Sequence, residues 1–296
     1  MERDSIIYKT RRKCQVLAAK VLSKETLSKM YYRIYLKKKL DLDKPMSFNE
    51  KIQWMKLYYY PQNKLVIRST DKYEVREIVK SYGYANRLVP LYGVWDRAED
   101  IDWNMLPNQF VLKCNHGCGY NILVHNKQSA NIDGCNKQLN KWLKEDFGEF
   151  NIEPHYSKIK RRRIICEQYL GEMITDYKFF CFDGKPRFIY VSKDLVHDRQ
   201  AQIGFFDLNG EKMPLHRDDY EDISEIVLPP FYTDMKIAAE VLSKDYPFVR
   251  VDFFISNNTW YFAELTFTPG AGLMPFNPDY YDMEWGKLIN LPEAGV

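Results

Sequence analysis

Apolar positions recur along the chain with two different periods, and the change of period separates predicted helices from predicted strands. Helical spacing runs through five segments, at residues 14–39, 49–60, 71–83, 129–150 and 234–246. The second of these follows Ser47, which stands three residues before Glu50, the spacing of a capping box. The third ends at Gly83, a residue type common at helix C-caps. We therefore expect helices at these five places.

Strand-like runs lie between the predicted helices. Short apolar runs occur at 88–95 (LVPLYGVW), 110–115 (FVLKCN) and 164–170 (IICEQYL). Residues 177–191 predict a β-hairpin around Asp183-Gly184, a pair typical of type I′ turns, and residues 248–267 predict a second hairpin. Helices mixed with antiparallel hairpins indicate an α+β protein.

The second hairpin has one apolar face on each strand. These faces consist of Val249, Val251, Phe253 and Ile255 on the first strand, and of Tyr261, Ala263, Leu265 and Phe267 on the second. Pairing the two faces puts 255 opposite 261, 253 opposite 263 and 251 opposite 265, with an odd number of residues in the turn. A two-residue Asn257-Asn258 turn would shift the register by one and reverse a face. Burial is worth roughly 1.5–3 kcal/mol per apolar side chain, so we expect the apolar pairing to prevail.

The expected register brings acidic side chains together. It pairs Asp252 with Glu264 and Arg250 with Thr266 on the other face. Two opposed carboxylates repel each other, and a divalent cation removes that conflict, with Mg²⁺ the best match for oxygen ligands. The alternative is a solvated face with two unrelated acids, but the apolar neighbours Phe254 and Phe262 argue against free exposure. We favour the magnesium site.

Two further segments carry candidate nucleotide chemistry. In FVLKCNHGCGYN (110–121) a strand delivers Lys113 into a glycine-rich turn, which suits phosphate binding by backbone N–H groups and a point charge, without the Walker A sequence. A zinc site or a Cys–His nucleophile in this segment lacks partner ligands and an orienting group. The strand IICEQYL could offer its main chain to an adenine, with Asp176 for the ribose; otherwise it is a buried strand with one acid at its end.

Composition limits the classes of protein to consider. The chain has 296 residues, 45% hydrophobic and 28% charged, and six scattered cysteines, which suits a soluble cytoplasmic protein without a disulfide scaffold. It has no run of about 18 apolar residues. Residues 1–40 hold twelve basic and three acidic residues. This basic segment is either a solvated helical face, which we favour, or a contact for an anionic membrane surface or polyanionic substrate.

Taken together and in order, these motifs resemble the TupA-like ATP-grasp family, named for a teichuronopeptide-biosynthesis protein. The matching text covers residues 45–280 and includes MSFNEKIQWMKLY, DKYEVREIV, FVLKCNHGCGYN, IICEQYL, DYKFFCFDGKPRFIYV and VRVDFF…WYFAELTFTPGAG. The resemblance implies an α+β ATP-grasp fold that holds a nucleotide between two α+β subdomains. It divides the chain into a basic helical segment (1–45), an N-terminal subdomain (46–106), a lid with the glycine-rich loop (107–170) and a C-terminal subdomain with the magnesium site (171–296).

The resemblance also implies residue roles. The nucleotide-binding residues would be the phosphate-side Lys72 and Lys113, the loop residues His116, Gly117 and Gly119, the adenine hinge Glu167, Gln168, Tyr169 and Leu170, and the ribose ligand Asp176. The catalytic residues would be Lys178 and Arg250, beside the transferring phosphoryl group. The magnesium ligands would be Asp252, Glu264 and Thr266. At this last position most ATP-grasp sequences have asparagine, and a hydroxyl is the weaker ligand.

The implied activity is an ATP- and Mg²⁺-dependent carboxylate–amine ligation through an acyl-phosphate. The family implies a surface-polysaccharide substrate, such as a uronic-acid or amino-sugar unit joined to an amino acid, handled in the cytoplasm or at the inner membrane face. We expect no nucleic-acid partner and infer no obligate protein partner. The alternatives are a phosphotransferase acting on a sugar and a glycosyltransferase. The latter is supported only by Asp41-Leu42-Asp43, which precedes Lys44-Pro45 instead of following an apolar strand.

Overall fold

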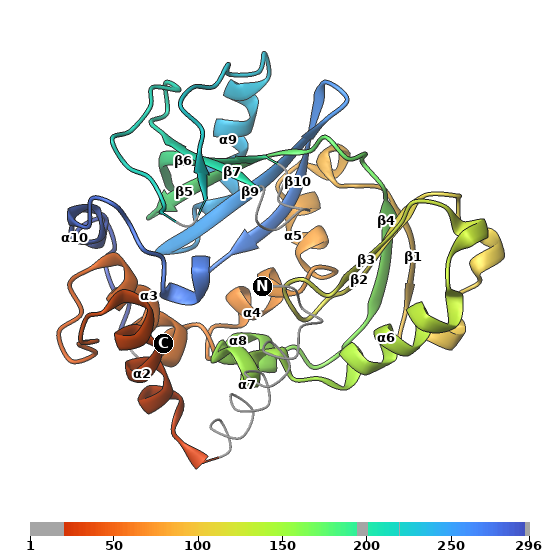
Figure 1. The fold of residues 1–296 in the computed structure, drawn as a ribbon, viewed down its shortest axis with the longest axis horizontal. Helices are drawn as coiled ribbons and strands as arrows, with labels where there is room; N and C mark the ends of the chain where they lie inside the picture. Colours follow the sequence, from red (N-terminus) through yellow and green to blue (C-terminus); the bar gives the residue numbers. More distant parts are fainter. Residues whose placement is uncertain (1–20, 194–200, 219, 294–296) are drawn as a thin grey trace.

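Two β-sheets, with short helices between them, form the frame of the protein (Figure 1). The computed structural model describes residues 21–193, 201–218 and 220–293. The smaller sheet has the order β1 (Leu91–Trp95), β4 (Ile164–Gln168), β2 (Phe110–Cys114), β3 (Asn121–Val124). The larger sheet has the order β10 (Thr259–Thr266), β9 (Phe248–Ser256), β5 (Thr175–Phe182), β6 (Lys185–Lys193), β7 (Gln202–Phe206), β8 (Glu221–Asp222). All neighbouring strands are antiparallel except β7 and β8. The predicted α+β class is confirmed.

Within the described residues, nine α-helices and one π-helical turn pack around these sheets. The α-helices are α2 (Lys24–Leu36), α3 (Phe48–Trp54), α4 (Lys64–Thr70), α5 (Val75–Ser81), α6 (Ile132–Lys144), α7 (Phe147–Asn151), α8 (Pro154–Ser157), α9 (Tyr232–Ser243) and α10 (Tyr280–Gly286). A π-helical turn, η1 (Met55–Tyr59), continues α3 without a break. The capping box predicted at Ser47 is confirmed, with both Ser47 and Glu50 bonding the opposite main chain. Within the described residues no helix is both long and apolar enough to cross a bilayer.

The two faces of the larger sheet have different cover. Helix α9 packs on the face that carries the buried residues Phe179, Val251 and Phe253. On the other face α3 and α10 cover only one end, where Phe48 packs edge-on against Phe248 at 5.0 Å between ring centroids. Because side chains alternate along a strand, Phe248 shares its face with Arg250 and Asp252. The apolar end of this face is thus closed by helices, and its other end is polar.

The smaller sheet is asymmetric in the same way. One face contributes Phe110, Leu112 and Cys166 to a second apolar core with α6 and α7. The opposite face carries Lys113 and Glu167, and it is turned toward α5, because Arg76 of α5 contacts Glu167. Strand β1, which the sequence analysis grouped with residues 46–106, pairs with β4 in this sheet. Along the chain, the sheet therefore begins at Leu91.

Some predicted element boundaries are wrong. The helix expected from Asp71 begins at Val75, because the Asp71 carboxylate accepts hydrogen bonds from the main-chain N–H groups of Tyr73 and Glu74 and holds a turn there. The helix expected at 129–150 is divided into α6 and α7 by Asp146, which caps α7. The first expected helix is present as α2, and its part before residue 21 lies outside the described residues.

The hairpin β9–β10 has one register next to its turn and another beyond a β-bulge. These are the two registers that the sequence analysis weighed as alternatives. Its turn has two residues, Asn257 and Asn258, both with positive φ (50° and 56°), and next to it 255 pairs with 260 and 253 with 262. A β-bulge between 262 and 264 then shifts the pairing by one residue. Beyond the bulge 252 pairs with 264, 251 with 265 and 250 with 266.

The expected pairs 255–261 and 253–263, and the odd-numbered turn, are therefore wrong. The bulge allows a two-residue turn without loss of the apolar face: Trp260, Phe262 and Leu265 are buried, whereas Tyr261 and Ala263 are not. The predicted pairing of Asp252 with Glu264 is confirmed.

Candidate active site

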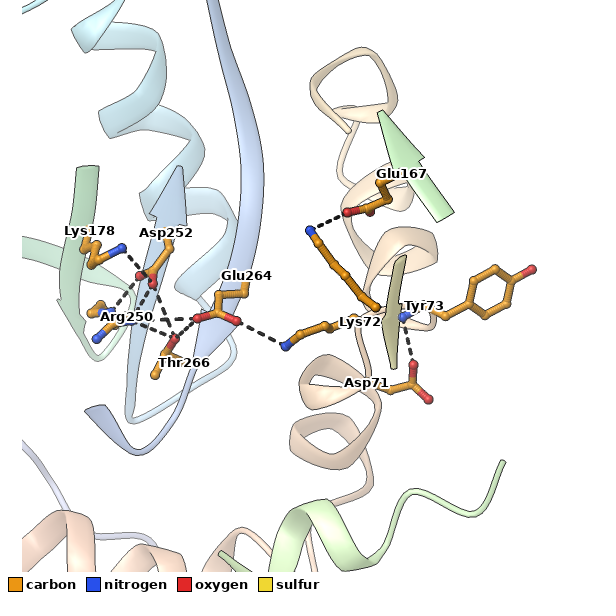
Figure 2. Close-up of polar contacts among 10 residues, drawn as sticks. Asp71, Lys72, Tyr73, Glu167, Lys178, Arg250, Asp252, Glu264 and Thr266 are labelled. Atoms are coloured by element: carbon orange, nitrogen blue, oxygen red, sulfur yellow. Dashed lines mark hydrogen bonds and ion pairs between the residues drawn. The ribbon is translucent and has the colours of Figure 1, made fainter. Parts of the chain in front are cut away.

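The polar end of the larger sheet gathers charges from three adjacent strands (Figure 2). Lys178 of β5 is paired with Asp252 of β9, which is paired in turn with Glu264 of β10. Asp252 is 1% exposed, and Arg250 binds both of its oxygens, with Nε to Oδ1 at 2.7 Å and Nη2 to Oδ2 at 2.5 Å. Lys178 Nζ lies 3.8 Å from Asp252 and 3.1 Å from Asp176. Sheet register alone brings these residues together.

Glu264 is the most accessible member of this cluster, and cations surround it. Its carboxylate lies 3.3 Å from Lys72 Nζ and 3.9 Å from Arg250 Nη2, and it accepts a hydrogen bond from Thr266 Oγ1 at 3.2 Å. Burial opposes ionisation of this carboxyl, but Lys72, Arg250 and Lys178 outweigh it and lower the pKa of Glu264 to about 2. Glu264 is thus a stable anion at neutral pH.

A second set of charges lies on the smaller sheet. Glu167 accepts hydrogen bonds from Lys113 Nζ at 2.6 Å and from Arg76 Nη1 at 2.8 Å. Arg76 is also bonded to the main-chain oxygen of Val89. The role of Arg76 was not predicted, because in the sequence it is one of many charged residues on a helix. Glu167 therefore contributes its side chain, as well as its main chain, to this region.

Lys72 lies between the two sets. Its main-chain N–H bonds the carbonyl of Asn115, the residue after β2, and the Asn115 amide bonds the Asp71 carboxylate at 2.7 Å. Its ammonium group points at Glu264 on the other sheet (Figure 2). Burial disfavours the charged form, but Glu264 and neighbouring charges outweigh burial and raise the pKa of Lys72. The predicted phosphate-side lysines thus have different places, Lys113 on the smaller sheet and Lys72 between the sheets.

The glycine-rich turn follows β2, and its residues differ in placement. His116 is 1% exposed, with Nε2 at 3.0 Å from the Trp142 carbonyl oxygen and its ring against Tyr120, so the side chain belongs to the core of the smaller sheet. Burial lowers the pKa of His116 to about 4. Gly119 has a φ of +70°, which glycine adopts without strain. A Cβ at Gly117 would lie 2.7 Å from the Tyr120 ring.

The expected adenine hinge lies where β4 ends. The Gln168 N–H donates to the Pro90 carbonyl, and the Leu170 carbonyl accepts from Ser256 Oγ of β9, so this segment links the two sheets. The Tyr169 ring lies against His125. Asp176, at the start of β5, is 6% exposed and interacts with Lys178 and Ser192. The roles of this segment in binding adenine and ribose stay predictions.

Two motifs were considered for other activities: Asp41-Leu42-Asp43 for a glycosyltransferase, and the cysteines of the glycine-rich turn for zinc binding or nucleophilic catalysis. Asp41 Oδ1 accepts hydrogen bonds from the main-chain N–H groups of Asp43 and Lys44, both at 2.9 Å, so the Asp-x-Asp sequence stabilises a turn. Cys114 is buried in the smaller core and Cys118 is exposed. In the described part of the chain, no three His, Cys, Asp or Glu residues gather as a protein-only metal site would require.

A family model described as TupA-like ATPgrasp matches residues 50–290. The chain belongs to the TupA-like ATP-grasp family. It thereby has the ATP-grasp fold, consistent with the two sheets and the charged residues between them. Among curated proteins, none matches the chain in sequence.

Solved structures similar to this TupA-like chain include ligases and a synthetase. D-alanine–D-alanine ligase from Bacillus anthracis is 18% identical over 68% of this chain and 58% of its own, with a TM-score of 0.42. L-amino acid ligase from Bacillus licheniformis is 13% identical over 70% and 44%, with a TM-score of 0.42. N5-carboxyaminoimidazole synthetase from Staphylococcus aureus is 15% identical over 78% and 55%, with a TM-score of 0.40. The chain spans about half the length of these proteins.

The ATP-grasp family implies Mg²⁺, and the donor set fits that ion. Mg²⁺ is commonly held by one or two carboxylates together with substrate phosphates and waters, and not by an all-protein cage. Asp252 and Glu264 supply two carboxylates, and the Thr266 hydroxyl lies 3.5 Å from the first and 3.2 Å from the second. Arg250 covers both oxygens of Asp252, so a cation at Asp252 would displace one of these N–H groups.

Proposed function

We propose that this chain is an ATP-dependent carboxylate–amine ligase that acts through an acyl-phosphate. The observation that carries the proposal is the placement of Lys72, whose ammonium lies between Glu264 of the larger sheet and the Lys113–Glu167 pair of the smaller sheet. A triphosphate is the polyanion that such an arrangement suits, with cations on several sides and two carboxylates for its magnesium. Family membership supports ATP as the nucleotide.

Most of the predicted residues have a role in this proposal. Lys113 and Lys72 bind phosphate oxygens, and main-chain groups at Gly117 and Gly119 cover them. Tyr169 and Leu170 hold adenine at the link between the sheets, and Asp176 binds the ribose. Asp252, Glu264 and Thr266 would hold Mg²⁺, which neutralises charge on the phosphates.

The reaction is a transfer in two stages. A substrate carboxylate oxygen attacks the γ-phosphorus, the bond to the bridging oxygen breaks, and ADP leaves with that electron pair. An amine nitrogen then attacks the carbonyl carbon of the acyl-phosphate, the carbon–oxygen bond to phosphate breaks, and the amine loses one proton. Arg250 and Lys178 contribute positive charge beside the transferring group, which lowers the energy of the charged transition state.

For the substrate we propose a uronic-acid or amino-sugar unit of a surface polysaccharide, joined to an amino acid. The support is the family resemblance together with the basic composition of residues 1–40, which suits a polyanionic or lipid-linked glycan at the inner membrane face. We propose a cytoplasmic location for the reaction, because ATP is its substrate.

The test is product analysis with the full chain, MgCl₂ and ATP. Glucuronic acid and galacturonic acid are each combined with one amino acid at a time. The release of ADP is measured first, and the products are then identified by mass spectrometry. An amide with ADP and phosphate supports the ligase, and hydroxylamine in place of the amino acid should trap a hydroxamate. A phosphorylated sugar would indicate a phosphotransferase instead, and nucleoside diphosphate released from a UDP-sugar would indicate a glycosyltransferase.

A further inference from the structure

The carboxylate of Glu167 is shared between two cations on the face of the smaller sheet that is turned toward α5. Its Oε1 accepts a hydrogen bond from Arg76 Nη1 at 2.8 Å, and its Oε2 accepts one from Lys113 Nζ at 2.6 Å. The side chains of Glu167 and Arg76 are 9% and 10% exposed, whereas that of Lys113 is 22% exposed. This buried carboxylate thus has one charged partner on each oxygen.

The two partners of Glu167 differ in how firmly they are held. Arg76 lies in α5 and donates a second hydrogen bond, at 2.8 Å, to the main-chain carbonyl of Val89. Lys113 is the more exposed of the two, and within the described residues its one ion pair is with Glu167. Its ammonium group is carried on a flexible four-carbon stem. Lys113 is therefore the partner that can leave Glu167, and Arg76 is the partner that stays.

The larger sheet repeats this arrangement of a lysine, a glutamate and an arginine. Lys72 Nζ lies 3.3 Å from the Glu264 carboxylate, and Arg250 Nη2 lies 3.9 Å from the same group. Arg250, like Arg76, is fixed by a further contact, in this case with Asp252. Each phosphate-side lysine therefore rests on a glutamate that has an arginine as its second cation. The recurrence on both sheets indicates a role that goes beyond one local contact.

A lysine that binds phosphate first has to leave its glutamate. Removal of one partner from a buried ion pair leaves an uncompensated charge and is strongly unfavourable. With Arg76 in place, Glu167 keeps a charge-assisted hydrogen bond after Lys113 has left. Without Arg76, the departure of Lys113 would leave Glu167 buried and unpaired. The arginine thus lowers the cost of releasing the lysine.

We propose that Arg76 is a positioning residue for ATP binding: it holds Glu167, so that Lys113 can exchange this carboxylate for the triphosphate. The inference rests on the proposed function, in which Lys113 binds phosphate oxygens. Arg76 acts through Glu167 and needs no contact with the nucleotide. Its loss should therefore weaken the binding of nucleotides that carry phosphates, and not the binding of adenosine.

The binding of AMP-PNP and of adenosine separates this role from a structural one. Both are measured on the full chain with Mg²⁺, AMP-PNP by calorimetry and adenosine by displacement of a fluorescent ATP analogue. Arg76→Met should bind AMP-PNP at least about tenfold more weakly than the wild type, because Lys113 then has to leave an otherwise unpaired carboxylate. The affinity of the variant for adenosine should be unchanged, since adenosine has no phosphate to bind Lys113.

A second substitution tests the route through Glu167. Glu167→Gln removes the charge that retains Lys113, so this variant should bind AMP-PNP at least as tightly as the wild type does. In its presence Arg76→Met should change the affinity for AMP-PNP by no more than about threefold, because the two substitutions act on one interaction. Arg76→Lys keeps a cation beside Glu167 and should bind AMP-PNP more tightly than Arg76→Met.

Arg162→Met is the matched control. Arg162 also pairs with a carboxylate, that of Asp146 at 3.6 Å, and donates to a main-chain carbonyl, that of Leu143 at 3.1 Å. It has no part in the exchange at Glu167, so Arg162→Met should bind AMP-PNP as the wild type does. If Arg76→Met does not fold, Arg76→Lys takes its place, with a smaller loss of AMP-PNP affinity that Glu167→Gln again removes.

Two outcomes overturn this inference. One is that the Arg76 variants bind AMP-PNP as the wild type does. The other is that they bind AMP-PNP more weakly by the same factor with and without Glu167→Gln, or lose affinity for adenosine to the same extent, since Arg76 would then support the whole sheet. Failure of the wild type to bind AMP-PNP would instead contradict the proposed function itself.

Discussion

The ammonium group of Lys72 lies 3.3 Å from the carboxylate of Glu264, although the two residues are 192 positions apart in the chain. The contact joins the turn before α5 to strand β10, and it places a cation and an anion where phosphates and magnesium are expected (Figure 2). A bound triphosphate would compete with Glu264 for Lys72, and magnesium would replace Lys72 as the cation beside the Glu264 carboxylate. The contact therefore links the two halves of the proposed site.

Glu264→Gln should abolish most of the activity without unfolding the protein. The side chain is 36% exposed, so the neutral amide can be accommodated, but one of two magnesium carboxylates is lost. Mutation of a residue that only orients a metal ligand typically costs about 10–100-fold in metal affinity or activity. Glu264 is proposed to bind the metal directly, so we expect at least that loss. ADP release at several Mg²⁺ concentrations tests this. The control is Glu77→Gln, an exposed glutamate on α5 whose one ion pair within the described residues is with Lys80.

Acid should remove the stabilising contribution of Glu264. The surrounding cations lower the pKa of Glu264 from 4.5 to about 2. A carboxyl with a lowered native pKa stabilises the native state above its unfolded pKa, and this contribution is lost as the pH falls from about 4.5 toward 2. The free energy of unfolding of the wild type should therefore exceed that of Glu264→Gln at pH 7, with a difference that shrinks over this range. Urea titrations of both proteins at each pH measure it, and a pH-independent difference would contradict the assignment.

Much of this site could be predicted from the sequence because it depends on strand register. Period-two alternation fixes which side chains share a face, so Asp252, Glu264 and Arg250 could be placed together from pattern alone. The bulge after Phe262 could not be predicted. In the sequence, the two-residue turn and the burial of the apolar face require different registers, and nothing in the sequence shows that a bulge can satisfy both. The structure satisfies both preferences by leaving Ala263 out of the regular ladder.

Contacts between distant segments were beyond prediction. Arg76 donates a hydrogen bond to Glu167, and Asn115 donates one to Asp71. Nothing in the sequence around Arg76 or Asn115 indicates these partners. For His116 the family resemblance implies nucleotide contact, which stays a prediction, and the structure shows that its ring packs in the core of the smaller sheet. A loop motif gives the path of the main chain, but the direction of one side chain depends on tertiary neighbours.

Lys113→Ala should weaken ATP binding at least about tenfold, because a charge-assisted hydrogen bond to phosphate is lost. The fold should persist, since Arg76 still pairs with Glu167 and the Lys113 side chain is 22% exposed. Thermal unfolding with and without ATP–Mg²⁺ measures this, because a ligand specific to the native state raises apparent stability. Lys141→Ala, on the exposed side of α6, is the control. An unfolded variant whose native fraction binds ATP normally would show Lys113 to be structural.

The loop after β10 allows a prediction about backbone strain. Ala271 has a φ of 57°, in the left-handed region, between two glycines that also have positive φ. This conformation costs an L-residue roughly 1–2 kcal/mol, and glycine avoids it at the expense of a more flexible unfolded chain. Ala271→Gly should therefore stabilise the protein by about 0.5–1 kcal/mol in urea unfolding. Ala85→Gly, at an exposed 3₁₀ position with ordinary φ, should lower stability instead.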